Sequence, residues 1–313
     1  MSENKKKKAG KKYHINQSPL YKLKSFVKLA NLLKISKDTL KKYKKPNAGN
    51  FKVFSLNNRE IQEPIGVTYS IHDILSRLLS RIETPKWLQS SKKGCSYKTN
   101  AQFHQHSRQV ITLDIKSFYQ NTTQNMIRLC FLEIFECSPD VAYILSKICC
   151  FNNHLPTGSK ISIYLSFFAN SKMFDEICRI AQLRNASISI YVDDITISGN
   201  GVDYSVLNTI TKAIERNGHS ISQHKTKRFT ANRTPIITGV AVSKNSLKPT
   251  NKHYKRLRHK IKNLQKNYSH LTKYDLEREG QSIKGYQNFS KSFGAPQPKE
   301  LRKIIDILDD LLE

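Results

Sequence analysis

The stretch SISIYVDDITISGNG, residues 187–201, places two adjacent carboxylates, Asp193 and Asp194, within an apolar run. β-branched residues alternate on both sides of the pair, which predicts a hairpin with the aspartates at its tip. Aspartates are also common in ordinary turns, because their side chains bond to nearby backbone. Glycine, which favours a tight hairpin, comes only at Gly199, so an ordinary turn is the weaker interpretation. Two neighbouring, partly desolvated carboxylates stay ionised only beside a cation, and the pair therefore indicates a hard divalent ion such as Mg²⁺.

A third carboxylate, Asp114, occurs in a second apolar segment. Residues 110–115 read as a buried strand, and the aromatic residues Phe118 and Tyr119 follow it. A carboxylate without a partner would be costly among these apolar side chains. Asp114 therefore also requires a cation, and the three aspartates become candidate ligands of one metal site.

The chain carries 53 Lys and Arg residues against 24 Asp and Glu residues in a length of 313, a formal net charge of +29. So large a positive charge favours a polyanionic partner such as nucleic acid. No apolar run approaches the length of a membrane span, and the N-terminal MSENKKKKAGKKY lacks the apolar segment of a signal peptide. We therefore expect a cytoplasmic protein with no membrane partner. The six cysteines lack paired CxxC spacing and are expected to be reduced residues of the core.

Outside these segments the pattern is mainly helical. Residues 1–20 form a Lys-rich arm that we expect to be disordered. Apolar residues at helical spacing predict an amphipathic helix around residues 71–82 and further helices around 126–135 and 139–150. Residues 251–267 carry seven Lys or Arg and no acid, with apolar residues near helical spacing, which predicts a basic helix.

Three motifs follow one another along the chain: TLDIKSFY at 112–119, LPTGSKIS at 155–162 and YVDD at 191–194. In this order they resemble the catalytic motifs in the palm of a reverse transcriptase. Within that group the chain looks most like a bacterial retron reverse transcriptase, because TNAQFH resembles the retron NAxxH element and IITGVAVS resembles the retron VTG element. The resemblance covers roughly residues 20–310.

The resemblance implies an α+β fold with right-hand polymerase architecture: fingers, a palm made of an antiparallel sheet plus helices, and a helical thumb. The implied division of the chain is a basic disordered arm at 1–20, N-terminal helices and fingers at 21–107, a palm at 108–250 with fingers helices inserted around 121–160, and a basic helical thumb at 251–313. A final, locally acidic helix is expected at 301–312.

The resemblance also implies a two-metal site. DNA synthesis uses two ions about 4 Å apart, one at the primer hydroxyl and one at the triphosphate. Asp114 and Asp193 would bridge two Mg²⁺ ions, and Asp194 would support the site beside them.

Further residues match the nucleotide pocket of the family. Tyr119 would exclude a ribose 2′-OH, Arg59 would pair with the triphosphate, and Lys225 would protonate pyrophosphate. Each also has a plainer interpretation, since Tyr119 could simply pack at a strand end and surface Arg and Lys are abundant in this chain. Thr157 and Gly158 are further candidate nucleotide contacts, and Thr157 stands in place of the glutamine of the usual LPQG motif. Ile163 stands where the family has a proline and Phe167 where it often has an asparagine, so we expect retained activity with unusual nucleotide affinity or fidelity.

The retron-like elements and the basic helix supply the candidate RNA contacts. Backbone contacts give affinity, whereas RNA recognition reads shape and stacked bases. The predicted RNA-binding residues are Asn100, His104, Thr238, Gly239, Tyr254, Lys255, Arg256 and Arg258.

Three functional hypotheses follow. The first is a retron reverse transcriptase that uses dNTPs and its cognate non-coding RNA, primes from an internal guanosine 2′-OH and makes the branched hybrid msDNA, in antiphage defence beside an effector protein. The second is another prokaryotic reverse transcriptase, of intron or diversity-generating type. The third is an RNA-binding scaffold with a decayed site, which the intact aspartates oppose and which Thr157 keeps open.

Overall fold

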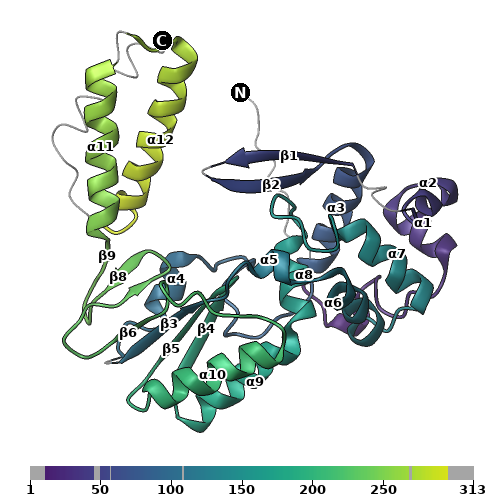
Figure 1. Cartoon of the computed structure of the whole chain (residues 1–313), viewed down its shortest axis with the longest axis horizontal. Coiled ribbons are helices and arrows are strands. Elements are labelled where there is room, and N and C mark those ends of the chain that lie inside the picture. Colours follow the sequence, from purple (N-terminus) through teal and green to yellow (C-terminus); the bar gives the residue numbers. More distant parts are fainter. Residues whose placement is uncertain (1–10, 46–49, 57, 108, 268–269, 295–313) are drawn as a thin grey trace.

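The computed structural model describes residues 11–45, 50–56, 58–107, 109–267 and 270–294. A four-stranded antiparallel sheet in the order β4-β5-β3-β6 carries the predicted metal ligands. Helices α9 (Ser171–Leu183) and α10 (Tyr204–Arg216) lie together along one side of this sheet (Figure 1). Its strands are β3 (Val110–Asp114), β4 (Ser187–Tyr191), β5 (Asp194–Ser198) and β6 (Lys227–Phe229).

The predicted hairpin is confirmed. Strands β4 and β5 pair in antiparallel register from Ser187 opposite Ser198 to Tyr191 opposite Asp194. Ile195 and Ile197 of β5 are fully buried because this strand lies between β4 and β3. β-branched side chains suit such a position, since they pack well on a pleated surface covered by neighbours.

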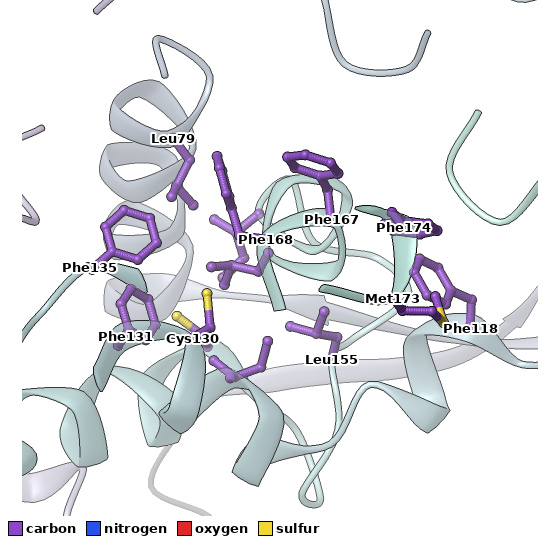
Figure 2. Packing of buried hydrophobic residues seen from close by; sticks show 14 of the residues in the cluster. Leu79, Phe118, Cys130, Phe131, Phe135, Leu155, Phe167, Phe168, Met173 and Phe174 are labelled. Atoms are coloured by element: carbon purple, nitrogen blue, oxygen red, sulfur yellow. The ribbon is translucent and has the colours of Figure 1, made fainter. Parts of the chain in front are cut away.

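A group of helices adjoins the sheet. Figure 2 shows Phe131, Phe135 and Phe168 packed into their shared core, with ring centroids of successive pairs 5.5 and 5.6 Å apart. Truncating a buried phenylalanine of this kind to alanine typically costs about 3–5 kcal/mol. Five of the six cysteines are buried and all six are free thiols. The helices are α1 (Phe26–Leu33), α2 (Lys37–Lys42), α3 (Gly66–Leu79), α5 (Phe118–Asn121), α6 (Gln124–Leu129), the π-helix η2 (Cys130–Ile134), α7 (Pro139–Cys149) and α8 (Ser162–Ala169).

Two smaller sheets and a helix pair complete the described chain. The hairpin of β1 (Phe51–Leu56) and β2 (Arg59–Pro64) projects beside α3 (Figure 1). A three-stranded sheet of β7 (Ile236–Ile237), β8 (Val240–Val242) and β9 (Leu247–Pro249) leads into α11 (Asn251–Asn267) and α12 (Lys273–Lys291). These two helices pack through a separate core of Leu257, Ile261, Leu264 and Ile283. None of the described helices is long and apolar enough to cross a membrane.

The sequence analysis assigned too many residues to the disordered arm, because the second half of residues 1–20 is ordered. Residues 11–20 pack on the helical core: the Tyr13 amide donates to the Arg81 carbonyl at 3.0 Å, η1 (Ile15–Gln17) follows, and Leu20 is fully buried. The Lys content suggested disorder, but the few apolar residues at 13–20 are enough to dock this segment. The first half of the arm and the predicted helix at 301–312 lie outside the described residues.

His104 joins the short helix α4 (Tyr97–Gln102) to the sheet. The side chain is fully buried, with Nδ1 2.7 Å from Ser198 Oγ on β5 and Nε2 2.8 Å from Ser189 Oγ on β4. Both ring nitrogens therefore have hydroxyl partners, which suits a neutral imidazole. Burial lowers the pKa of His104 to about 3.

This burial predicts acid sensitivity. The folded-state pKa of His104 lies below the unfolded value near 6.5, so between these values only the unfolded chain binds the proton, and stability falls as the pH drops from 6.5 toward 3. We expect a loss of about 2 kcal/mol in the free energy of unfolding at pH 5 from this group. Urea unfolding of the wild type and His104→Gln at pH 7.5 and pH 5 measures it. An equal pH dependence in the two proteins would contradict the assignment.

Candidate active site

The pairing of β3 with β5 brings the three aspartates together. Asp114 ends β3 directly opposite Asp194, the first residue of β5. Asp193 occupies the turn just before, and its carbonyl accepts a hydrogen bond from the Ile115 amide at 3.0 Å. Two strand ends and one turn thus hold all three carboxylates at the same edge of the sheet.

The turn contains a strained residue. Val192 has a φ of +62°, a left-handed conformation that a β-branched side chain rarely adopts and that costs about 1–3 kcal/mol. The Val192 amide donates to Ser90 Oγ at 3.2 Å, which anchors the turn to the segment that follows α3. The hairpin therefore presents Asp193 in one defined orientation.

The electrostatics of the site oppose full ionisation of the aspartates. Burial, followed by repulsion from Asp193 and Asp114, raises the pKa of Asp194 to about 7. Burial also raises the pKa of Asp193, Asp114 adds to this effect, and the positive charges of Lys225 and Arg59 oppose it. Without an added cation, the protein therefore carries these carboxylates at a cost in free energy.

Lys225 supplies one positive charge to the site. Its Nζ lies 2.8 Å from Asp114 Oδ1, and Asp114 itself is 8% exposed.

The structure contains no preformed metal site among the described residues, since no group of three His, Cys, Asp or Glu side chains is arranged to hold an ion. The donor set nevertheless fits hard divalent cations, because it consists only of crowded carboxylate oxygens whose repulsion such ions relieve.

One cleft joins the aspartates to the predicted nucleotide-binding residues. Asp114, Asp193 and Asp194 line it together with Arg59 from β2, Tyr119 from α5, Thr157 and Lys225. Burial, followed by the charge of Asp193, raises the pKa of the Tyr119 hydroxyl, so Tyr119 is a neutral ring beside the carboxylates. Gly158 lies one residue from this lining, with its backbone against β2.

The NAxxH residues are internal. Asn100 and His104 are both fully buried, which corrects the expectation that their side chains contact RNA directly. The side-chain Nδ2 of Asn100 donates to Thr238 Oγ1 at 3.5 Å, and the Thr238 hydroxyl donates to the Tyr97 carbonyl at 2.9 Å. The retron-like elements thus meet each other between α4 and the β7–β8 turn. Thr238 is half-buried and Gly239 is exposed, and both line a second cleft that shares Asp194 and Lys225 with the first.

The basic residues of α11 remain accessible. Lys255, Arg256 and Arg258 are exposed, whereas Tyr254 is half-buried beside the ring of His253. Their contact with RNA stays a prediction.

Two buried residues that contact the loop containing Thr157 escaped the sequence analysis. Gln62 of β2 is 2% exposed, and its Oε1 accepts hydrogen bonds from the backbone and the side chain of Thr157. His72 of α3 is buried and contacts Ser159. No local pattern marks either residue, because both partners are more than 80 positions away in the chain.

Comparisons with known proteins agree with this geometry. Residues 43–254 match the family described as reverse transcriptase (RNA-dependent DNA polymerase). The retron Se72 reverse transcriptase of Salmonella heidelberg is 29% identical over 60% of this chain and 51% of its own length. The Escherichia coli retron Ec48 and Ec86 reverse transcriptases are 24% and 25% identical, over 68% and 60% of this chain and 57% and 59% of their own lengths. The chain thus spans little more than half the length of these relatives.

These matches confirm the predicted resemblance to retron reverse transcriptases and the α+β right-hand polymerase fold. The family match spans β1–β2, the sheet with the three aspartates, and the start of α11. The chain belongs to the reverse transcriptase family.

Proposed function

We propose that this protein is an RNA-directed DNA polymerase of the retron type. It would copy a cognate non-coding RNA from dNTPs, prime from an internal guanosine 2′-OH and yield branched msDNA. The observation that carries the proposal is the shared cleft, in which three carboxylates lie with Arg59 and Tyr119. A decayed RNA-binding scaffold would have no reason to retain this combination.

The side chains of the cleft have complementary roles in this reaction. The exposed Arg59 guanidinium suits the triphosphate, because its planar donors bind phosphate oxygens in pairs. The ring of Tyr119, beside Asp193, would pack under the sugar and leave no room for a 2′-hydroxyl. Lys225 lies within the same cleft and would donate a proton to the leaving pyrophosphate.

Asp114, Asp193 and Asp194 would hold two Mg²⁺ ions. Bound there, the ions would activate the primer hydroxyl and neutralise charge on the leaving group. The raised pKa of Asp194 supports this role, because a crowded carboxylate group gains most from added cations.

The names of the relatives support the retron assignment over intron or diversity-generating types. The partners would be the non-coding RNA, msDNA and an effector protein in antiphage defence in the cytoplasm. The net charge of +29 suits the RNA partner, and the exposed basic face of α11 would grip its backbone.

The metal site is tested by Asp193→Asn. Removing one ligand should lower Mg²⁺-dependent dNTP incorporation on a primed RNA template by at least a hundredfold, while relief of repulsion keeps the metal-free protein as stable as wild type. Mg²⁺ at one hundred times its Kd should stabilise the wild type by about 2.7 kcal/mol, and the variant by much less. Asp140→Asn, on the exposed start of α7, is the control. Wild-type incorporation by Asp193→Asn would refute the site.

The sugar-selection role is tested at Tyr119. Tyr119→Ala opens the space beside Asp193, so the ratio of kcat/KM for a ribonucleotide to that for the matching deoxyribonucleotide should rise at least tenfold. Tyr119→Phe retains the ring and should discriminate far better than the alanine variant. If the alanine variant keeps the wild-type ratio, Tyr119 only packs.

The proposed contact of α11 with RNA phosphates is tested by replacing Lys255, Arg256 and Arg258 together with Gln. If each contacts one phosphate, the log-log salt slope of RNA binding should become shallower by about 2–3. Filter binding against salt, on the cognate RNA and an unrelated RNA of equal length, measures the slope.

A matched control removes the same charge elsewhere. Lys37, Lys42 and Lys45 are exposed on and just after α2, which lies on the other side of the molecule from α11 (Figure 1). Their triple Gln variant should bind with nearly the wild-type slope. Equal salt slopes for the α11 variant and the wild type would rule out contact between these three side chains and RNA phosphates.

A further inference from the structure

The LPTG loop contacts the β1–β2 hairpin through Thr157. The Thr157 amide donates to Gln62 Oε1 at 3.0 Å, and the Thr157 hydroxyl lies 3.0 Å from the same oxygen and 2.9 Å from the Glu60 carbonyl. Gln62 is 2% exposed, and its Nε2 donates to Glu60 Oε1 at 2.8 Å. The threonine that departs from the family motif therefore bonds to the neighbouring strand.

The backbones of the loop and the strand also touch. The Gly158 amide donates to the Gln62 carbonyl at 3.1 Å. A Cβ added at Gly158 would lie 2.8 Å from both that carbonyl oxygen and Ile61 Cγ2, closer than real Cβ atoms approach. Only glycine permits this spacing, so the loop and β2 are in tight contact at Gly158 as well as at Thr157.

The loop is the fixed partner in this contact. His72 Nε2 lies 2.8 Å from the Ile148 carbonyl and must carry the proton there, so Nδ1 accepts from the Ser159 hydroxyl at 2.7 Å. The Ser162 hydroxyl donates to the Pro156 carbonyl at 2.6 Å. The hairpin, in contrast, is two-stranded and projects from the body of the molecule (Figure 1). A two-stranded hairpin is marginal alone and depends on what it packs against.

Arg59 depends on the same strand. It opens β2 directly before Glu60 and lines the same cleft as Asp193. Within the described residues the Arg59 guanidinium forms no hydrogen bond or ion pair. The position of the β2 backbone therefore determines which part of the cleft this side chain can contact.

We propose that Thr157 and Gln62 are positioning residues that hold β2 so that Arg59 faces the triphosphate of the incoming nucleotide. This inference rests on the proposed polymerase function. In this chain the loop contributes to nucleotide affinity through the strand and Arg59. Thr157, which replaces the motif glutamine, then supports the nucleotide pocket by bonding to β2 and holding Arg59 in place.

The test compares three variants at one position on a pre-annealed primer-template. Thr157→Val keeps the shape and loses the hydroxyl, so KM for dNTP should rise roughly three- to tenfold, the effect of one lost hydrogen bond, while kcat falls by less. Thr157→Ser keeps the hydroxyl and should lose much less affinity than the valine variant. Thr157→Gln cannot reproduce the hydroxyl contact and should raise KM.

A double variant shows whether Thr157 acts through Arg59. Thr157→Val should raise KM much less in an Arg59→Ala background than in the wild type, because the residue that it positions is gone. Amide hydrogen exchange of residues 51–64 without nucleotide should be faster in Thr157→Val, which reports the contact independently of activity.

The outcomes separate the two proposals. If the wild type incorporates no nucleotide, the proposed function fails, and this inference fails with it. If the wild type is active but Thr157→Val keeps its KM, or raises KM equally with and without Arg59, the positioning role alone is overturned.

Discussion

Repulsion among three partly buried carboxylates is the constraint on which the site depends. The register of β3 against β5 sets Asp114 opposite Asp194, and the strained turn adds Asp193. Hydrogen bonds across the sheet and to Ser90 maintain this crowding against its electrostatic cost. The Lys225 ammonium group offsets part of that cost at Asp114. A site built in this way is poised for divalent cations, since nothing else of comparable size would relieve so much negative charge.

The surrounding elements keep this arrangement rigid. His104 ties α4 to both strands of the hairpin through two serine hydroxyls, and Thr238 ties the next sheet to α4. Tyr97 of α4 also stacks on Phe289 of α12, with ring centroids 5.1 Å apart. The retron-like elements thus lie between the sheet that carries the three aspartates and the helix pair α11–α12. Their physical role in this structure is to connect these parts.

The hairpin that carries Asp193 and Asp194 could be predicted from the sequence because its evidence is local. Alternating isoleucines define the strands, and adjacent aspartates between them imply a cation wherever the strands lie. The cleft could be predicted only through resemblance, since Arg59 and Asp193 come together by tertiary packing. The burial of Asn100 and His104 could not be predicted, because polar residues in a short helical segment give no sign of which face is covered. The packing of residues 11–20 could not be predicted either, because the high lysine content of this segment indicated disorder. A few apolar side chains are nevertheless enough to attach it to the core.

The three departures from the family pattern have different physical meanings in the structure. Phe167 packs on Trp87 and Phe174, with ring centroids 5.9 and 6.2 Å away, and it lines a crevice beside Ile163 that is separate from the active-site cleft. Both residues lie on α8, which follows the loop, where Phe167 is buried in the core and Ile163 is half-buried. Thr157 alone reaches the cleft, and its hydrogen bonds run to β2. Since Ile163 and Phe167 do not line the cleft and Thr157 bonds to the hairpin, the departures change what surrounds the proposed nucleotide pocket and leave the three carboxylates in place.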